Sequence, residues 1–164
     1  LLKSSLRTLY FSMIYPYLQY CNIVWANTYQ SNLRRLVILQ KRIIRIINKS
    51  GIDVHTTPIF KNLKLLKFHD INKLQVCQFM FRFKNHLLPS SFEGLCTSNL
   101  EVHSHYTRSH HLFHIPSKRT KVSQFALSYQ GPLLFNSISK KIENCSSYSS
   151  FTNKLKDYLF SFYT

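Results

Sequence analysis

The sequence predicts a mainly α-helical protein, with a helical bundle followed by a small helical subdomain and an extended connector. Three observations favour this fold class. Apolar residues recur three or four positions apart in several stretches, as they do along one face of a helix. Hydrophobic residues make up 45% of the 164 residues, which is enough to form a buried core. Only three glycines are present, whereas a fold with many tight turns usually contains more.

These patterns divide the chain into four segments. The first, residues 1–50, and the second, residues 51–94, both show helical periodicity. The third, residues 95–129, is rich in histidine and serine and is typical of an extended connector, in which the alternation over residues 122–129 allows a short strand. The fourth, residues 130–164, contains the C-terminal helices.

Prolines, glycines and capping residues predict where the helices begin and end. Pro16 is expected to kink or end the first helix, and Asp70 is expected to cap a later one. Ser31 or Asn32 can cap the helix expected over residues 31–48. The expected helices span residues 1–20, 31–48, 58–66, 70–83, 131–138 and 150–162, with an aromatic connector at 20–29.

Charge is the most distinctive feature of the composition. There are 22 Lys and Arg residues against 6 Asp and Glu, which gives a formal net charge of +16. Such a charge repels itself unless a polyanion is near, and nucleic acid is the commonest polyanionic partner. An anionic membrane surface is the alternative. The composition therefore favours a protein that binds RNA or DNA.

The sequence also indicates where the protein is expected to act. No apolar run approaches the roughly 20 residues that a membrane-spanning helix needs. Residues 1–5 lack the layout of a signal peptide, and the first residue is not methionine, which predicts a fragment of a longer chain. Four widely spaced cysteines favour reduced thiols over disulfides. We therefore expect a nuclear or cytoplasmic protein with no membrane partner.

The second of the expected helices is the clearest amphipathic element. At about 100° per residue, one face of it holds Leu33, Leu36, Val37, Ile43, Ile44 and Ile47. Arg34, Lys41 and Arg45 form a stripe on the other side, and Arg35 and Arg42 widen it. This helix is expected to bury one side and to present cations to phosphate groups on the other.

Further basic residues flank this helix and surround the connector. Such charges can follow a nucleic-acid backbone while aromatic rings such as Tyr106 or Phe113 stack on bases. Core packing is the alternative for the rings, and an ordinary solvated surface is the alternative for the charges. The candidate nucleic-acid-binding residues are Arg34, Arg35, Lys41, Arg42, Arg45, Lys61, Lys64, Arg108, Lys118, Arg119 and Lys121.

The six carboxylates do not predict an active site. None is adjacent to another, and no Asp-x-Asp occurs. Two-metal phosphoryl transfer needs several carboxylates around ions about 4 Å apart, and glycoside cleavage needs a carboxylate pair. Asp70 and Asp157 are expected to cap or decorate helices, and Cys77, on an apolar helix face, is expected to be a core residue. The chain alone is therefore expected to be catalytically inactive.

A cluster of histidines is the remaining candidate for chemistry. Five histidines lie between residues 103 and 114, downstream of Cys96. Histidine binds zinc, but the close cysteine pair and the spaced histidines of common zinc motifs are absent. A polar connector with solvent-facing imidazole rings is the favoured interpretation. The sequence therefore predicts no metal site and no cofactor in this chain.

An ordered set of motifs extends along nearly the entire chain. It begins with YFSMIYPYLQYC at residues 10–21, followed by Val24-Trp25, and continues with LQKRIIRII at 39–47. The later motifs are HTTPIF, LLKFHDI, YTRS and YQGPLLFNSI, at residues 55–60, 65–71, 106–109 and 129–138. In content and order, the set resembles the region beyond the palm in reverse transcriptases of non-LTR retrotransposons, and the jockey-like groups are the closest in style.

The resemblance implies a thumb-like helical region over residues 1–50, with post-thumb helices after it. In the intact RNA-directed DNA polymerase, such a region would hold template RNA and nascent DNA against the palm of the same polypeptide. The family's catalytic aspartates and their Mg²⁺ belong to that upstream palm, and no residue here matches them. Phe135 stands where the family usually has Trp, and Ser139 where it usually has Pro, as expected for drift in a decaying copy.

The residues and the resemblance fit two functions. The first is the non-catalytic C-terminal part of a retrotransposon reverse transcriptase, which binds the template–primer. The second is a stand-alone basic helical module, derived from a mobile element, that binds nucleic acid or another partner. A degenerate remnant of such an element belongs to this second class. An in-frame palm motif with paired aspartates upstream would favour the first, and a start codon and promoter directly before Leu1 would favour the second.

Overall fold

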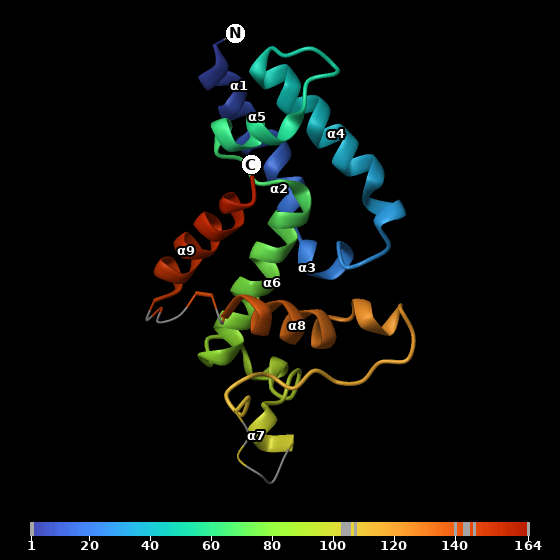
Figure 1. Cartoon of the computed structure of the whole chain (residues 1–164), viewed down its shortest axis with the longest axis vertical. Coiled ribbons are helices and arrows are strands. Elements are labelled where there is room, and N and C mark those ends of the chain that lie inside the picture. Colours follow the sequence, from blue (N-terminus) through green and yellow to red (C-terminus); the bar gives the residue numbers. More distant parts are fainter. Residues whose placement is uncertain are drawn as a thin grey trace. The chain divides into compact units, whose positions relative to one another are not determined.

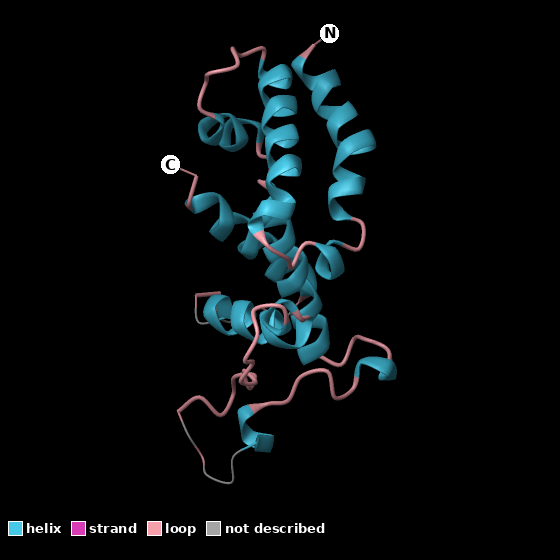
Figure 2. Ribbon diagram, turned by 90° about the vertical axis from the view of Figure 1, so that its right-hand side faces the viewer, coloured by secondary structure: helices cyan, strands magenta, loops and turns pink. Residues whose placement is uncertain are grey.

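The computed structural model is mainly helical, which confirms the predicted fold class (Figures 1 and 2). It describes residues 2–102, 106, 108–139, 141–142, 145 and 147–163. No β-strand occurs among these residues, and an isolated β-bridge pairs Ser98 with Phe113. The elements run in the order α1, the π-helical turn η1, α2 to α6, the 3-10 turn η2, α7, the 3-10 turn η3, α8 and α9.

The chain forms two compact units that cut across the four segments expected from sequence. Unit 1 comprises residues 1–74 together with 154–164, and unit 2 comprises residues 75–153. Two helices, α6 (Phe68–Lys84) and α9 (Tyr148–Ser161), each contribute residues to both units. Unit 1 is therefore built from two stretches of sequence, whereas unit 2 is one continuous stretch.

Unit 1 begins with a helical run in which the hydrogen-bond pattern changes from α-helical to π-helical before Pro16. Helix α1 (Lys3–Leu9) continues into η1 (Tyr10–Ile14) and then α2 (Tyr15–Gln19). At the end of η1 the N–H of Tyr15 donates to the carbonyl of Tyr10, five residues earlier. Pro16 has no N–H to donate, and a widened turn at this point accommodates the missing bond. The expected kink at Pro16 is therefore a π-helical turn within a continuous helical run.

The residues expected to form an aromatic connector contain a short helix, α3 (Asn22–Trp25). Cys21 precedes it in the left-handed backbone region, with φ 48°. The side chain of Asn22 is fully buried, donates to the carbonyl of Leu18 at 2.8 Å and accepts from Asn72 Nδ2 at 2.9 Å. These bonds hold α3 against α6 inside unit 1, which the aromatic composition did not predict.

The long amphipathic helix α4 (Gln30–Asn48) forms as the sequence predicts, although its capping residue differs. The N-cap is Tyr29, and no side chain caps this end, so the expected Ser31 and Asn32 caps are wrong. Asn32 instead donates to the Thr28 hydroxyl at 3.0 Å. The helix ends at Lys49, which adopts the left-handed conformation that is common after a helix. Helix α5 (Thr56–Leu63) then packs against α4.

A buried glutamine, Gln40, joins three parts of unit 1. Its Nε2 donates to the Tyr10 hydroxyl at 2.9 Å and to the Leu66 carbonyl at 3.0 Å. Its Oε1 accepts from the N–H of Phe68 at 2.8 Å, which caps the start of α6. Since the first N–H groups of a helix have no partner within the helix, this side chain supplies one. Gln40 is 2% exposed, so these bonds lie out of water.

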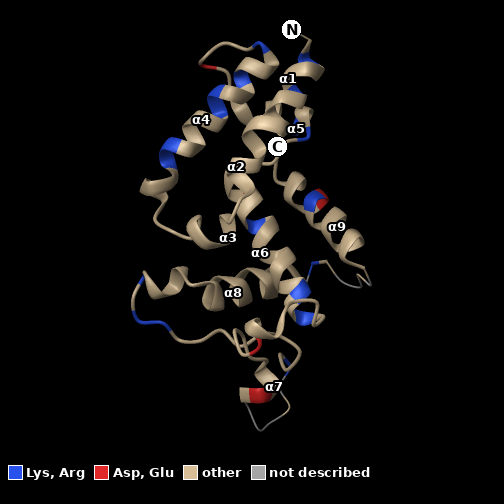
Figure 3. Cartoon of the chain, turned by 180° about the vertical axis from the view of Figure 1, so that it is seen from behind, with Lys and Arg blue, Asp and Glu red and all other residues tan. Residues whose placement is uncertain are grey.

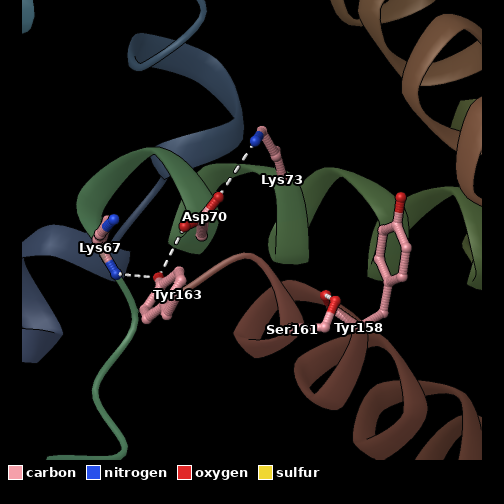
Figure 4. A network of polar contacts seen from close by, with 6 residues as sticks. All are labelled: Lys67, Asp70, Lys73, Tyr158, Ser161 and Tyr163. Atoms are coloured by element: carbon pink, nitrogen blue, oxygen red, sulfur yellow. Dashed lines mark hydrogen bonds and ion pairs between the residues drawn. The ribbon is translucent and has the colours of Figure 1, made fainter. Parts of the chain in front are cut away.

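Tyr163 makes a second connection to the same turn (Figure 4). Its hydroxyl accepts from the N–H of Lys67 and donates to Asp70 Oδ2, at 2.8 and 2.7 Å. Asp70 Oδ1 also receives Lys73 Nζ at 3.1 Å. Asp70 therefore lies in the first turn of α6 without capping it, and the predicted cap is replaced by an ion pair and a tyrosine partner. The end of the chain is fastened to the start of α6.

The buried tyrosines predict a loss of stability in alkali. Burial raises the pKa of Tyr10 to about 12, and burial also raises the pKa of Tyr163. In the unfolded chain tyrosine loses its proton near pH 10, so unfolding releases a proton between about pH 10 and pH 12, and stability falls as the pH rises through this window. Melting temperatures measured from pH 8 upward should show this fall. Tyr10→Phe should be less stable at neutral pH but lose less of its stability above about pH 10; an unchanged slope would contradict the assignment.

Unit 2 is centred on aromatic residues from α6, α8 (Leu127–Ser139) and α9. The rings of Phe81 and Phe151 stack with their centroids 4.6 Å apart. Gly131 and Pro132 are buried inside α8, which begins four residues before the expected start at Gly131. A Cβ atom on Gly131 would lie 2.6 Å from Met80 Sδ, so the glycine permits close approach of α8 and α6.

The connector between α6 and α8 contains only short helical elements in its described part. These are η2 (Ser90–Phe92), α7 (Asn99–Val102) and η3 (Ser123–Phe125). The Asn136 side chain on α8 holds the connector, because its Oδ1 accepts from the N–H of Phe113 and its Nδ2 donates to the Phe113 carbonyl, at 3.1 and 2.8 Å.

The short strand expected near residues 122–129 is wrong. Ser123–Phe125 form a 3-10 turn, and α8 begins at Leu127. The N–H of Ser123 donates to Thr120 Oγ1 at 3.2 Å, and the Ala126 carbonyl accepts the N–H groups of the residues three and four positions later. Local hydrogen bonds therefore satisfy this backbone, and alternation alone did not reveal them.

Candidate nucleic-acid interface

The basic face of α4 consists of Arg34, Arg35, Lys41, Arg42 and Arg45, as the sequence predicts. Figure 3 marks the Lys and Arg positions along this helix in blue. The first four side chains are exposed and Arg45 is half-buried. None of the five forms an ion pair in the part of the chain that the structure describes. At 1.5 Å per residue, the face extends about 16 Å along the helix. It can therefore meet several successive phosphates of one strand.

The buried face of α4 explains why these cations point outward. Leu33, Ile44 and Ile47 are buried in the core of unit 1, and the other apolar residues of the predicted face are half-buried. Because residues three and four apart share a helix face, burying these residues leaves the arginine and lysine positions toward solvent. The core of unit 1 thus fixes the direction of the basic face.

Arg45 differs from its neighbours because it has a structural partner. Its Nε donates to the Val54 carbonyl at 3.0 Å, which attaches the loop after α4 to the helix. The remaining nitrogen atoms of the guanidinium can still meet an anion, since arginine carries five N–H donors. Replacing Arg45 would therefore disturb the loop as well as the charge of the face.

The other candidate residues fall into two groups. Lys61 and Lys64 belong to unit 1 and are exposed, and Lys64 ends α5 in the left-handed conformation. Unit 2 contains Arg108, Lys118, Arg119 and Lys121; among them Lys118 is half-buried and its carbonyl accepts from Gln124 Nε2 at 3.2 Å. The structure thus brings the α4 and α5 residues into one unit and places the four connector residues in the other.

The excess charge is concentrated in unit 1. Fourteen of the 22 basic residues and three of the six acidic residues belong to it. Lys67, which continues the three-residue spacing of Lys61 and Lys64, adds to this charge just before α6. Lys3 and Arg7 on α1 are exposed and add to it as well, although no sequence pattern selected them, because each stands alone rather than in a stripe.

The two aromatic candidates for base stacking behave differently. Tyr106 is exposed, and its hydroxyl lies 2.7 Å from His110 Nε2. Phe113 is half-buried and packs against Phe83 and Phe135, with centroids 5.8 and 5.7 Å away. Phe113 therefore packs against other aromatic rings, as expected for a core residue rather than for a ring that stacks on bases. Tyr17 and Tyr20 in unit 1 are more exposed than Phe113, although the sequence did not single them out.

The described residues contain no group of three or more His, Cys, Asp or Glu side chains that could hold a metal ion. His103 and His105 of the predicted histidine cluster lie outside the described residues.

Cys77 is fully buried, as predicted for a core residue, and burial raises the pKa of the Cys96 thiol to about 11. A thiol with such a pKa is protonated at neutral pH and is a poor nucleophile.

None of the helices in the described part of the chain has the length and apolar character needed to cross a membrane. Comparisons with models of protein families, with curated protein sequences and with solved structures gave no match.

Proposed function

We propose that this chain binds nucleic acid through the basic face of α4, as the template–primer-holding, non-catalytic region of a non-LTR retrotransposon-type reverse transcriptase. The basic face carries the proposal. It is a helix surface whose cations form no ion pair with any residue that the structure describes, in a unit with few carboxylates. Such a surface is suited to a phosphate backbone, whose neutralisation releases counterions and supplies sequence-independent affinity.

The motifs that resemble this family support the narrower part of the proposal. Four of them, at residues 10–21, 39–47, 55–60 and 65–71, all lie in unit 1. Gln40 of the second motif forms hydrogen bonds to Tyr10 of the first and to residues of the fourth. Motifs that are far apart in the sequence thus build one structural unit, with the basic face on its surface.

The test replaces Arg34, Lys41 and Arg42 together with glutamine, which leaves the hydrogen bond of Arg45 to the loop intact. Removing three phosphate contacts should weaken binding of a single-stranded oligonucleotide by about 100-fold near 0.1 M salt and flatten the slope of log K against log salt by about 2. Fluorescence anisotropy titrations at several salt concentrations measure both quantities.

A matched control removes the same charge elsewhere. Lys84, Lys141 and Lys154 are exposed and lie outside the predicted set, so their triple replacement by glutamine has the same net charge. This control should keep most of the affinity and the salt slope of the parent chain. Equal losses in both triple variants would show that binding follows net charge alone and that α4 is not the interface.

A further inference from the structure

A cavity of about 360 Å³ lies beside the basic face of α4 within unit 1. Its walls come from the second half of α4, the loop that leads to α5, the first turn of α5 and the turn before α6. Lys41 and Arg45 belong both to this cavity and to the basic face. A strand that follows the face therefore meets the cavity.

The walls of the cavity carry more positive than negative charge. Lys41, Arg45 and Lys67 line it, and Asp53 is the carboxylate among the lining residues. Among the described residues, these three cations have no ion-pair partner, although Lys67 Nζ lies 4.5 Å from the centre of the Tyr163 ring. The net charge of these four groups is +2. A phosphate monoester carries a charge between about −1.5 and −2 at pH 7, so its charge is complementary to the cavity.

The ionisation of His69, in the cavity wall, depends on burial and on the charges around it. Burial lowers the pKa of His69, and the charges of Lys73 and Lys41 lower it further against the opposing effect of Asp70. Lys41, which lines the cavity, thus disfavours another positive charge at this position and would favour a negative one, whereas Asp70 acts in the opposite direction. The first turn of α5, which has no side-chain cap, also lines the cavity through Thr56 and Thr57. Its N–H groups add partial positive charge.

We propose that this cavity binds a terminal phosphate group of a nucleic-acid strand. The identity of the strand rests on the proposed function, whereas the phosphate chemistry rests on the cavity itself. A terminal monoester fits better than an internal phosphodiester, because the diester carries only one negative charge and continues as backbone on both sides. The turn that holds Lys67 is fixed by Gln40 and Tyr163, so this part of the cavity is rigid before the ligand arrives.

The experiment compares three labelled single-stranded oligonucleotides of one sequence, which carry a 5′-phosphate, a 3′-phosphate or no terminal phosphate. At about 0.15 M salt, one phosphorylated form should bind the full chain about tenfold more tightly than the unphosphorylated form, since a charged hydrogen-bond partner is gained. Inorganic phosphate should compete for this advantage. Lys67→Gln should abolish it, because the variant removes one of the cavity's cations.

A second variant keeps the test valid if Lys67→Gln fails to fold. Asp53 is exposed, and Asp53→Asn removes the carboxylate of a lining residue that would repel a phosphate, so inorganic phosphate should bind about threefold more tightly. Arg34→Gln serves as a control, because Arg34 lies on the basic face but does not line the cavity. It should weaken all three oligonucleotides by a similar factor and leave the preference for a terminal phosphate unchanged.

The outcomes separate this proposal from the proposed function. Equal binding of the three oligonucleotides, with no saturable binding of inorganic phosphate, would overturn the cavity proposal and leave nucleic-acid binding by α4 intact. Saturable binding of inorganic phosphate that responds to Asp53→Asn, without oligonucleotide binding, would overturn the proposed function and support a phosphate site for a free ligand. A terminal-phosphate advantage that survives in a folded Lys67→Gln variant would overturn the assignment of the site.

Discussion

Replacing Gln40 with leucine should lower the free energy of unfolding by about 3–5 kcal/mol, because three buried groups lose their partner at once. These groups are the Tyr10 hydroxyl, the Leu66 carbonyl and the N–H of Phe68. Leucine has nearly the same size, so the loss would come from unpaired polar groups rather than from a cavity. Urea denaturation followed by circular dichroism measures this change.

The control for this variant is Gln30→Leu at the start of the same helix. Gln30 is exposed, so the same exchange there should change stability by no more than about 0.5 kcal/mol. If both variants had the same stability, the buried network around Gln40 would not contribute to folding. The phosphate-binding cavity would also lose its rigid wall, so weaker inorganic phosphate binding by a folded Gln40→Leu chain is the accompanying expectation.

The second large effect is expected at Gly131. Even a Cβ atom there would lie 2.6 Å from Met80 Sδ and 3.2 Å from Met80 Cγ, and the Met80 side chain is fully buried. Gly131→Leu should therefore force α8 and α6 apart and destabilise unit 2 by about 3 kcal/mol. Hydrogen exchange resolves the effect by region, with faster exchange expected along α8 and in the second half of α6.

Gly51 provides the matched control for this substitution. A Cβ atom at Gly51 would meet only Val54 Cγ2, at 4.0 Å, and the residue is exposed in the loop after α4. Gly51→Leu should stay within about 0.5 kcal/mol of the parent chain. If Gly131→Leu were equally mild, the close approach of the two helices would not be the reason for a glycine in α8.

The sequence was informative where a single helix determines the outcome. The direction of Arg34 and Arg42 follows from the spacing of the apolar residues on α4, because a helix that buries one stripe must expose the opposite one. The mainly helical fold class and the core position of Cys77 follow from the same periodicity. These expectations needed no knowledge of which helices pack together.

The remaining features depend on tertiary contacts that no local pattern contains. Gln40 interrupts an apolar helix face, and only the position of Tyr10 and of the turn before α6 shows why a polar side chain is buried there. Asp70 is a residue type that often caps helices, but here its carboxylate accepts a hydrogen bond from Tyr163, which lies 93 residues away in the sequence. Pro132 resembles a helix start, yet α8 continues through it, because α8 gains burial of Gly131 and Pro132 in exchange for one lost hydrogen bond.

The division of unit 1 into two stretches has a consequence for protein synthesis. The ribosome releases residues 1–74 first, but the turn before α6 obtains its tyrosine partner only after residue 163 has been added. Unit 2, which is continuous, can complete its core earlier. Within these residues, the unit that begins earlier in the sequence is therefore expected to be completed later, whereas domains usually fold in the order in which they are synthesised. A ribosome-bound chain stalled after residue 153 and an unstructured linker, long enough to bring that residue out of the exit tunnel, should already protect unit 2 from protease, while the core behind the basic helix α4 still lacks residues 154–163.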